Sequence, residues 1–346
     1  MRIVLAGFGS VGRAAAKMLA DRAGDLHASG GLAPKLVGVI DSRGAAVSER
    51  GLDADLLVQA KEQHGTVGAV ATYGIADAGD SAALIRELSA DVLIESTPSN
   101  LTNPAPAFNN IKAALSTGKH AISVNKAPLA LAMPALLELA AYNRVQLRYS
   151  GTVGAGTPVL TMARSLSRGD RIEKIRGILN GTTNFILWKM KEEGSDYASA
   201  LAEAQKLGFA ETDPTTDVDG IDTATKVVIL ANAIFPKDAR ATMQDVRLTG
   251  IRGVSAQQIR DAGSRGQTIK LIGEIDATQV GCPRLSVSPQ EVLMHGPLDV
   301  PRGLNAVQYT LRTAGEVTVV GRGAGGPETA TAIIRDLVDI WHSTTN

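Results

Sequence analysis

The chain opens with a short apolar run that leads directly into a glycine-rich turn. Residues 3–6 form the run, the next six residues have the spacing GxGxxG, and residues 11–19 follow with the apolar spacing of a helix. Glycines permit a tight turn and a close approach of the backbone to a pyrophosphate, and a helix start offers unpaired N–H groups. A strand, this turn and a helix in succession predict a dinucleotide site. Its expected contacts are Gly7, Phe8, Gly9, Ser10, Val11 and Gly12.

The first 150 residues alternate between strand and helix patterns. Buried strands are expected at residues 36–40, 91–95, 120–124 and 145–149, and helices at 82–88, 109–116 and 135–141. Strands that alternate with helices favour a doubly wound parallel sheet with helices on both faces. We therefore predict an α/β fold in which a dinucleotide-binding Rossmann domain spans residues 1–150.

A glycine-rich stretch at residues 151–156 marks the expected end of that domain. Beyond it, strand patterns occur at residues 170–179, 271–276, 284–287, 306–313 and 316–319, with helices between some of them. This pattern predicts a second, α+β domain over residues 151–320. The amphipathic run at residues 329–341 predicts a helix in the last segment, 321–346.

Composition narrows the class of partner. The 35 Lys and Arg residues are balanced by 35 Asp and Glu residues, and aromatic residues make up only 3%. The chain therefore offers neither a basic surface nor stacking platforms for nucleic acid. It has no apolar run of the ~18–20 residues that a membrane span needs. The single cysteine, Cys282, cannot form an intramolecular disulfide and fits a reducing compartment. We expect a cytoplasmic protein that binds a small molecule, and neither nucleic acid nor a membrane.

The residues after the second expected strand bear on which dinucleotide binds. Asp41 ends that strand, where an acidic side chain commonly binds the ribose hydroxyls of NAD. It lies further along the chain than the usual ~20 residues, which we attribute to an inserted loop at residues 23–34. Ser42 and Arg43 follow directly, and Arg43 could pair with the 2′-phosphate of NADP or simply be an exposed loop charge. The sequence leaves NAD and NADP open and slightly favours NADP.

Two further polar turns follow expected strands. Thr97, Pro98 and Ser99 come after the strand at 91–95, and Lys126 comes after the strand at 120–124. Because ligands bind at the carboxyl ends of the strands in a doubly wound sheet, we expect these residues to contact the cofactor. Lys126 is also a candidate catalytic residue beside the nicotinamide and the substrate, although a bare lysine is more often solvated.

A segment rich in carboxylates, residues 207–226, runs into an apolar helix. Asp222 and Lys226 are four residues apart, so they share one face of that helix. An ammonium group can stabilise and protonate the oxygen anion that forms when a carbonyl is reduced. A surface ion pair is one alternative reading of this spacing. A cation-binding loop is a second alternative reading, although the glutamate that an EF-hand carries after its glycine is missing here.

Four motifs resemble those of the homoserine dehydrogenase family, in the same order. They are residues 7–12, Asn125-Lys126-Ala127-Pro128-Leu129-Ala130, Asn180-Gly181-Thr182-Thr183-Asn184-Phe185-Ile186-Leu187, and the segment 208–226 with its ExDP and DGxDxxxK patterns. The likeness spans nearly the whole chain and corresponds to a short form without an ACT domain. It implies a Rossmann domain, onto which the C-terminal helix packs back, and a second domain for substrate binding and dimerisation.

The resemblance also implies an activity and a set of residue roles. The activity is the reversible, NAD(P)H-dependent reduction of L-aspartate 4-semialdehyde to L-homoserine, on the route to threonine, methionine and isoleucine, by a homodimer. Lys226 would be the general acid and base, and Lys126 would contact both cofactor and substrate. Gly208 and Gly323 would approach the cofactor. The substrate would be bound by Glu211, Asp222, Asp213, Gly181 and Thr182.

A monovalent cation is a further implication of the resemblance. Many members of the family carry a glutamate before a TVGAG-like turn that helps to bind sodium. Here Ser150 stands at that position, while the backbone carbonyls of Val153 and Ala155 could still hold Na⁺ or K⁺. A glycine turn that only joins two domains is the alternative. Threonine inhibition through an ACT domain is not expected.

Two other classes of protein share part of the pattern. A different Rossmann oxidoreductase, such as a sugar dehydrogenase with a lysine-proline motif, would account for Lys126 but not for the segment 211–226. A redox sensor that binds NAD(P)H without turnover would need the glycine turn but not Lys226. Aspartate-semialdehyde dehydrogenase chemistry needs a thiol nucleophile, and Cys282 lies in no recognisable nucleophile motif. Turnover of homoserine by the purified protein separates these classes.

Overall fold

The computed structural model describes residues 1–235, 240–279 and 281–345. The chain divides into two compact units. The first unit is Met1–Gly156 together with Gly325–Asn346, and the second unit is Thr157–Ala324. Within the described ranges, no helix is both long enough and apolar enough to cross a membrane.

A seven-stranded sheet forms the centre of the first unit, in the order β4-β3-β2-β1-β5-β6-β7. Five of the strands run parallel, whereas β3 and β4 are antiparallel. The chain passes from β1 to β2 on one side and resumes at β5 on the other, so the strand order reverses at β1. This is the doubly wound Rossmann arrangement that the sequence predicts. The strands are β1 (Arg2–Ala6), β2 (Lys35–Asp41), β3 (Gly44–Val47), β4 (Gly74–Ala76), β5 (Val92–Glu95), β6 (His120–Ser123) and β7 (Leu147–Arg148).

The helices of the first unit include two that the sequence analysis did not expect, at residues 23–30 and 54–64. The expectation of an inserted loop at residues 23–34 is wrong, because α2 (Ala23–Gly30) fills most of it and ends at Gly31 in the left-handed conformation. Leu26 is the one buried residue of α2, so the helix lacks the apolar stripe from which a pattern is recognised. The other elements are α1 (Ser10–Asp21), α3 (Ala54–His64), η1 (Val67–Ala69), α4 (Ser81–Glu87), α5 (Ala107–Ser116), α6 (Ala127–Tyr142) and η2 (Ser150–Thr152).

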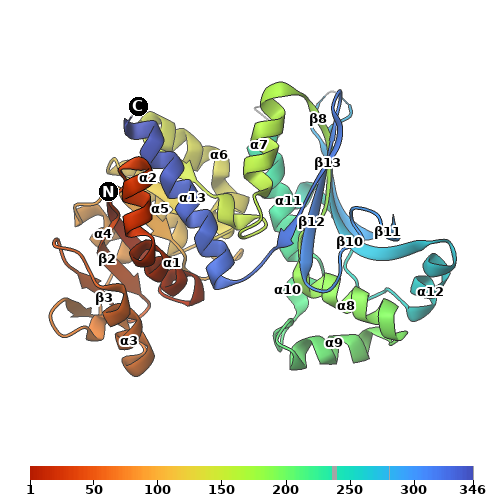
Figure 1. Cartoon of the computed structure of the whole chain (residues 1–346), viewed down its shortest axis with the longest axis horizontal. Helices are drawn as coiled ribbons and strands as arrows, with labels where there is room; N and C mark the ends of the chain where they lie inside the picture. The colour runs from red at the N-terminus through yellow and green to blue at the C-terminus, as the bar shows by residue number, and fades with distance from the viewer. Residues whose placement is uncertain (236–239, 280, 346) are drawn as a thin grey trace. The chain divides into compact units, whose positions relative to one another are not determined.

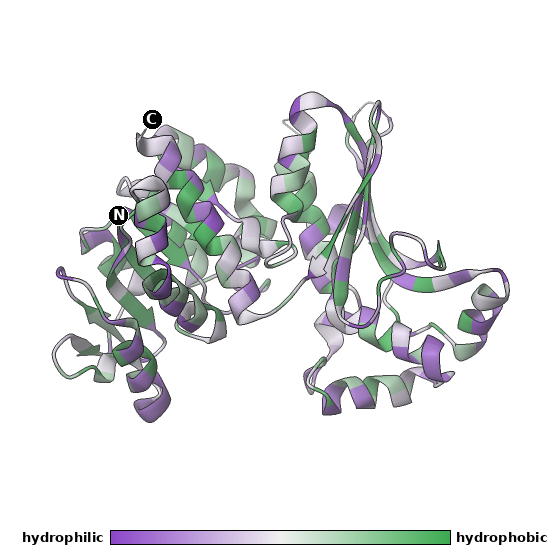
Figure 2. Cartoon of the chain, in the orientation of Figure 1, coloured by the Kyte–Doolittle hydropathy of each residue, from purple (hydrophilic) through white to green (hydrophobic). Residues whose placement is uncertain are grey.

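The C-terminal helix α13 (Gly326–Thr345) belongs to the first unit and lies against α1 (Figure 1). Leu337 and Ile340 of α13 are fully buried and share a core cluster with apolar residues of β1. The indole Nε1 of Trp341 donates a hydrogen bond of 2.7 Å to the carbonyl of Gly30. In Figure 2 the strands of this sheet are mainly green and α3 is largely purple. The apolar core therefore lies between the sheet and its helices, and α13 completes it.

A six-stranded sheet forms the second unit, in the order β13-β12-β8-β10-β11-β9. The pairs are antiparallel, except that β9 runs parallel to β11. The strands are β8 (Ile172–Ile178), β9 (Val246–Leu248), β10 (Gln267–Asp276), β11 (Arg284–Leu293), β12 (Leu304–Leu311) and β13 (Gly315–Arg322).

Helices lie on both faces of this second sheet. A Cβ built on Gly273 of β10 would come within 2.7 Å of Val227, so α11 packs closely on that face. Lys270 of β10 points to the opposite face and donates a hydrogen bond of 2.9 Å to Asn184 of α8. The structure confirms the expected α+β second unit. Its helices are α7 (Val159–Gly169), α8 (Gly181–Glu193), α9 (Tyr197–Lys206), α10 (Thr215–Val218), α11 (Ile221–Ile234), η3 (Met243–Asp245) and α12 (Ala256–Ser264).

Candidate active site

The glycine turn between β1 and α1 is tightly packed at both ends. A Cβ on Gly12 would lie 2.1 Å from the carbonyl oxygen of Gly7, so this position accepts only glycine. Gly7 has a φ of +90°, and a Cβ there would come within 2.5 Å of the Ser96 backbone. These two close approaches fix the path of the turn against the end of β5.

The middle of the same turn is open. Apart from Gly9 itself and its chain neighbours Phe8 and Ser10, no atom of the described residues lies within 4 Å of a Cβ built on Gly9. Phe8 is buried beneath the turn, whereas Ser10 is exposed and begins α1, and Val11 follows it. The first N–H groups of α1 thus lie beside open space, as pyrophosphate binding requires.

Two other polar turns reach the same edge of the sheet. Thr97, Pro98 and Ser99 follow β5 and Lys126 follows β6, at the carboxyl ends of parallel strands. Ser99 Oγ accepts a hydrogen bond of 3.0 Å from the backbone N–H of Lys126. Asn125 Nδ2 donates to the carbonyls of Thr97 at 3.0 Å and Pro98 at 3.1 Å. The structure brings these four expected contacts together around Asn125, to which the sequence analysis gave no role.

Asp41 ends β2 at this edge, but its carboxylate is engaged within the protein. Its side chain is 2% exposed and accepts from Lys61 Nζ at 2.7 Å. The backbone N–H groups of Arg43 and Val67 and the hydroxyl of Thr66 each donate to it at 2.9 Å. Burial alone would raise the pKa of Asp41, but these hydrogen bonds, led by that of Lys61, hold it below its ordinary value. A carboxylate with four acceptor positions filled is poorly placed to accept from ribose hydroxyls.

Ser42 and Arg43 are exposed in the turn between β2 and β3. Arg43 Nη2 donates to the carbonyl of His64, at the end of α3, at 3.3 Å. A Cβ on Gly65 would come within 1.7 Å of that guanidinium group, so the glycine gives the arginine its space. Arg43 as a whole is exposed near the end of β2, where an anion can approach it.

Lys226 and Asp222 form a buried ion pair on α11. Each residue is 7% exposed. Lys226 Nζ donates to Asp222 Oδ2 at 2.6 Å and to the carbonyl of Leu179 at 2.5 Å. Asn180 Nδ2 donates to the same carboxylate oxygen at 3.0 Å. The alternative of a surface ion pair fails, because both side chains are more than nine-tenths buried.

Asn180 belongs to this cluster although the sequence analysis gave it no role. It caps α8, where its Oδ1 accepts from the N–H of Thr183 at 2.9 Å. Its Nδ2 also donates to Asp217 at 2.6 Å. The available signal was its position directly before the helix that begins with Gly181. Asp217 is thereby engaged with Asn180. Within the described ranges no three His, Cys, Asp or Glu side chains gather as a metal site.

The first turn of α8 is hydrogen-bonded to the segment that contains Gly208. Gly181 and Thr182 form this turn, and Thr182 Oγ1 donates to the carbonyl of Phe209 at 2.7 Å. The ring of Phe209 stacks on Phe185 with 4.2 Å between ring centroids. Gly208 precedes it with a φ of +77°. Residues expected to contact the substrate and the cofactor thus meet at the start of α8.

Glu211 and Asp213 differ from Asp222 because both are exposed. The backbone carbonyl of Glu211 accepts from Gln205 Nε2 at 3.1 Å. The carboxylate of Asp213 accepts from the N–H of Thr215 at 3.0 Å. Hydrogen bonds from the hydroxyl and N–H of Thr215 lower the pKa of Asp213. The carboxylate of Asp213 is therefore ionised at neutral pH, and both side chains are open to solvent.

Gly323 lies against a buried amide that the sequence pattern did not reveal. A Cβ on Gly323 would come within 1.9 Å of Asn305 Nδ2. Asn305 is fully buried on β12, and neither Nδ2 nor Oδ1 has a hydrogen-bond partner among the described residues. Buried amides are nearly always paired. Gly323 is thus needed to leave room for an unsatisfied polar group.

The candidate cation turn contains two left-handed residues, Gly154 at φ +86° and Ala155 at φ +49°. Ser150, which stands in place of the family glutamate, donates its hydroxyl to Asp336 at 2.6 Å and its N–H at 2.8 Å. Asp336 lies on α13 and is 1% exposed. A buried carboxylate therefore does meet Ser150, from another part of the chain. The carbonyls of Val153 and Ala155 are hard oxygen donors, which fit Na⁺ or K⁺.

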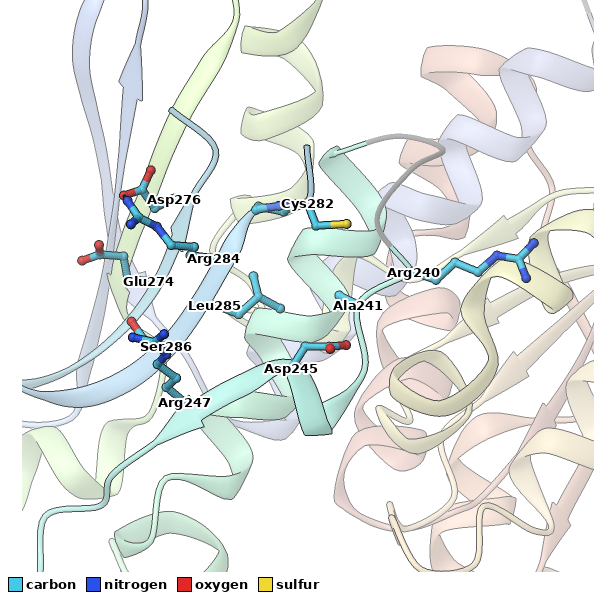
Figure 3. Close-up of a pocket in the computed structure, with 11 residues that line it drawn as sticks. Arg240, Ala241, Asp245, Arg247, Glu274, Asp276, Cys282, Arg284, Leu285 and Ser286 are labelled. Atoms are coloured by element: carbon cyan, nitrogen blue, oxygen red, sulfur yellow. The ribbon is translucent and has the colours of Figure 1, made fainter. Parts of the chain in front are cut away.

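The second unit also has a surface pocket of about 510 Å³ (Figure 3). Arg240, Asp245 and Cys282 are among the residues that line it. Arg284 in its wall pairs with Asp276 at 2.9 Å. None of the described residues that line the pocket is a site residue expected from the sequence. The pocket is therefore distinct from the cluster around Lys226.

Family models, sequence relatives and solved structures all match this chain. A family model for homoserine dehydrogenase matches residues 158–338, and a model for glutamate, leucine, phenylalanine and valine dehydrogenases matches residues 1–117. A homoserine dehydrogenase of Methanocaldococcus jannaschii is 42% identical over 99% of both chains. An NAD(+)-dependent homoserine dehydrogenase of Pseudomonas canavaninivorans is 39% identical over 99% of this chain and 97% of that protein. The structure of a hyperthermophilic archaeal homoserine dehydrogenase in complex with NADPH is 28% identical with a TM-score of 0.84, over 99% of this chain and 98% of that chain.

The Rossmann unit with its glycine turn, joined to a unit with a buried lysine–carboxylate pair, defines the class of NAD(P)-dependent oxidoreductases. Within that class, the chain belongs to the homoserine dehydrogenase family. The family resemblance of the sequence motifs is thereby confirmed.

Proposed function

We propose that this chain catalyses the reversible reduction of L-aspartate 4-semialdehyde to L-homoserine, with NAD(P)H as the reductant. The observation that carries the proposal is the buried pair of Lys226 and Asp222, in a chain of the homoserine dehydrogenase family. Burying two charges costs desolvation energy, so a buried pair is weak support for a stabilising role. Titratable groups in such environments cluster at sites of chemistry.

Lys226 is the proposed proton donor in the reduction and the proton acceptor in the reverse reaction. Bound NAD(P)H supplies the hydride that adds to the aldehyde carbon. The aldehyde oxygen then gains negative charge, and the ammonium of Lys226 stabilises and protonates it. Asp222 holds the amine at 2.6 Å, and Asn180 orients the carboxylate from 3.0 Å. Lys126 is proposed as a second cation near the cofactor and the substrate.

The α-ammonium and α-carboxylate groups of homoserine need binding partners of opposite charge. Glu211, Asp213 and Asp222 are proposed to bind the α-ammonium group. Gly181 and Thr182 lie in the first turn of α8, whose free N–H groups suit the α-carboxylate. Since Glu211 and Asp213 are exposed, a ligand can reach them without a change in the core.

NADP is the proposed cofactor, with NAD as the alternative. The carboxylate of Asp41 already accepts four hydrogen bonds, and the guanidinium of the exposed Arg43 suits a 2′-phosphate. Similar proteins include one named NAD(+)-dependent and one solved with NADPH, so the family accommodates both. The proposed cofactor contacts are Gly7, Phe8, Gly9, Ser10, Val11, Gly12, Ser42, Arg43, Thr97, Pro98, Ser99, Lys126, Gly208 and Gly323. Asp41 would act at the cofactor site by holding the turn that carries Ser42 and Arg43, through the N–H of Arg43, and not by accepting from the ribose.

Three further features are proposals that rest on the family resemblance and, for the location, on composition. The carbonyls of Val153 and Ala155 would hold Na⁺ or K⁺. The second unit would mediate a homodimer. The chain would act in the cytoplasm, in the biosynthesis of threonine, methionine and isoleucine. Sedimentation of the purified protein tests the dimer, and turnover with and without sodium or potassium tests the cation.

The decisive experiment is to follow the absorbance of NADH and NADPH as they form from L-homoserine and each oxidised cofactor. We expect both NADH and NADPH to form, and we expect kcat/KM to be higher for NADP⁺ than for NAD⁺. A sugar dehydrogenase would instead oxidise polyols in a parallel assay. A redox sensor would bind NADPH without turnover. If no reduced cofactor forms from homoserine, the proposed function is wrong.

A further inference from the structure

A buried carboxylate at the end of β5 has no part in the proposed reaction. Glu95 is 0% exposed and lies across the sheet from Ala6 of β1 and Ser123 of β6. Burial raises the pKa of this carboxyl group, and hydrogen bonds from Thr97 and Asn110 oppose that shift. Within the described residues its partners are all neutral. A carboxylate without a cation is expensive to bury, so its presence needs an explanation.

The two oxygens of Glu95 are used for different tasks. Oε1 accepts the hydroxyl of Thr97 and also its backbone N–H, the latter at 2.8 Å. Oε2 accepts from Asn110 Nδ2 at 2.8 Å. The amide oxygen of Asn110 accepts in turn from Ser81 Oγ at 2.7 Å. One carboxylate oxygen therefore fixes both the backbone and the side chain of Thr97.

From Thr97 an unbroken series of hydrogen bonds leads to Lys126. Asn125 Nδ2 donates to the carbonyls of Thr97 at 3.0 Å and Pro98 at 3.1 Å. Asn125 Oδ1 accepts from Ser99 Oγ at 2.9 Å. Ser99 Oγ accepts from the backbone N–H of Lys126 at 3.0 Å. The turn after β5 and the turn after β6 are thus held as one assembly that begins at Glu95.

The same turn also contacts the glycine turn after β1. Ser96 Oγ donates to the carbonyl of Gly7 at 2.8 Å. A Cβ atom added to Gly7 would lie only 2.5 Å from the backbone of Ser96. A shift of Thr97 would therefore disturb the glycine turn as well as Lys126.

We propose that Glu95 is a positioning residue for the cofactor, because its buried oxygen fixes the turn at Thr97 and, through Asn125, the backbone of Lys126. The proposal rests on the proposed function in one respect, that a nicotinamide dinucleotide binds at this edge of the sheet. It requires an acceptor oxygen directed at Thr97. It does not require a negative charge.

Two substitutions of similar size separate the oxygen from the charge. Glu95→Gln keeps an oxygen for both bonds from Thr97. Its new amide can donate to Asn110, if the Asn110 amide turns over and Ser81 accepts instead of donating. Glu95→Met removes the oxygen and leaves the donors of Thr97 and Asn110 without their acceptor. Because unsatisfied buried donors are costly, the methionine variant should melt at a lower temperature than the wild type, and thermal unfolding shows whether it still folds.

The readout is equilibrium binding of NADPH, followed by its fluorescence, together with the KM values for NADP⁺ and homoserine. We expect Glu95→Met to weaken NADPH binding about tenfold or more and to raise the KM for NADP⁺ in proportion. The KM for homoserine should rise by less than the KM for NADP⁺, because Thr97, Pro98 and Ser99 are proposed to contact the cofactor, whereas Lys126 is proposed to lie near both ligands. Glu95→Gln should bind NADPH within about threefold of the wild type. Ser81→Ala, which breaks only the outer end of the network, serves as the control and should bind as the wild type does.

Wild-type binding of NADPH by Glu95→Met would overturn the positioning role. So would an equal loss in Glu95→Gln, because the charge would then be the important property. If Glu95→Met does not fold, Asn125→Asp tests the same assembly, since it cannot donate to the carbonyls of Thr97 and Pro98. It should show the same selective rise in the KM for NADP⁺, and an unchanged KM would overturn the proposal. A wild-type protein that binds no dinucleotide would overturn the proposed function together with this role.

Discussion

Among single side chains, Lys226 differs from a surface lysine because its amine has a carboxylate, a carbonyl and little solvent around it. Such an amine is held in one position, which is what proton transfer to a substrate oxygen requires. We expect Lys226→Ala to lower kcat by roughly 10²–10⁴ while the affinity for NADPH stays nearly unchanged. Steady-state turnover of homoserine and NADPH fluorescence measure the two quantities.

A second lysine of the same unit provides the control for that variant. Lys174 pairs with Glu274 at 3.3 Å on the sheet, and its side chain is 32% exposed. Lys174→Ala should therefore retain turnover close to that of the wild type. Circular dichroism shows whether Lys226→Ala folds despite the loss of the ion pair with Asp222. Full turnover by a folded Lys226→Ala would remove the proton-transfer role from this residue.

Lys270 makes the stability of the second unit depend on pH. Burial lowers its pKa to about 8, and the nearby Asp299 opposes the shift. Between about pH 8 and its ordinary value of 10.5, the unfolded chain binds more protons here than the folded chain, so stability rises with pH. Below pH 8 both states are protonated, and the full cost of the buried charge, roughly 3 kcal/mol, is present.

The variant Lys270→Met has no proton to bind at this position. We expect the free energy of unfolding of the wild type, minus that of Lys270→Met, to increase as the pH is raised from 8 towards 10. Urea unfolding of both proteins at several pH values measures the difference, in which titrating groups distant from Lys270 cancel. Curves that stay parallel over this range would show that Lys270 has an ordinary pKa in the folded protein.

Among the elements, α13 shows how a distant segment completes a core. Leu337 of α13 is 0% exposed and belongs to the cluster that includes Leu5 of β1. Leu337→Ala should leave a cavity and lower the free energy of unfolding by about 2–5 kcal/mol. Asp339→Ala is the control, because Asp339 is 44% exposed and pairs with Arg148 at 3.5 Å on the surface. Urea unfolding of the two variants tests this, and a loss below about 1 kcal/mol for Leu337→Ala would mean that the site collapses or is not packed as described.

Elements with a regular pattern were predictable from the sequence, and those without one were not. The strand, glycine turn and helix at the start of the chain, and the spacing of Asp222 and Lys226, are local features that a sequence shows directly. The helix α2 has one buried residue and contains glycines, so no apolar period marks it. Asn180 meets Asp222 across 42 residues of sequence, and such a contact depends on how strands and helices pack. The unsatisfied amide of Asn305 beside Gly323 is likewise a consequence of pairing between β12 and β13.

For the molecule as a whole, the unfolding of each unit can be followed separately, because each unit contains one of the two tryptophans of the chain. Trp341 lies on α13 in the first unit, and Trp188 lies on α8 in the second. Trp188→Phe and Trp341→Phe each leave one tryptophan, whose fluorescence reports the unfolding of its own unit.

Cofactor binding should stabilise mainly the unit that carries the glycine turn. At a concentration of about 100 times its Kd, a ligand that binds only the folded state adds about 2.7 kcal/mol to the free energy of unfolding. We therefore expect NADP⁺ to raise the urea midpoint reported by Trp341 more than that reported by Trp188, and homoserine to do the reverse. Equal shifts of both signals with NADP⁺ would mean that the two units unfold together. A larger shift at Trp188 would mean that the dinucleotide binds chiefly to the second unit, against the role assigned to residues 7–12.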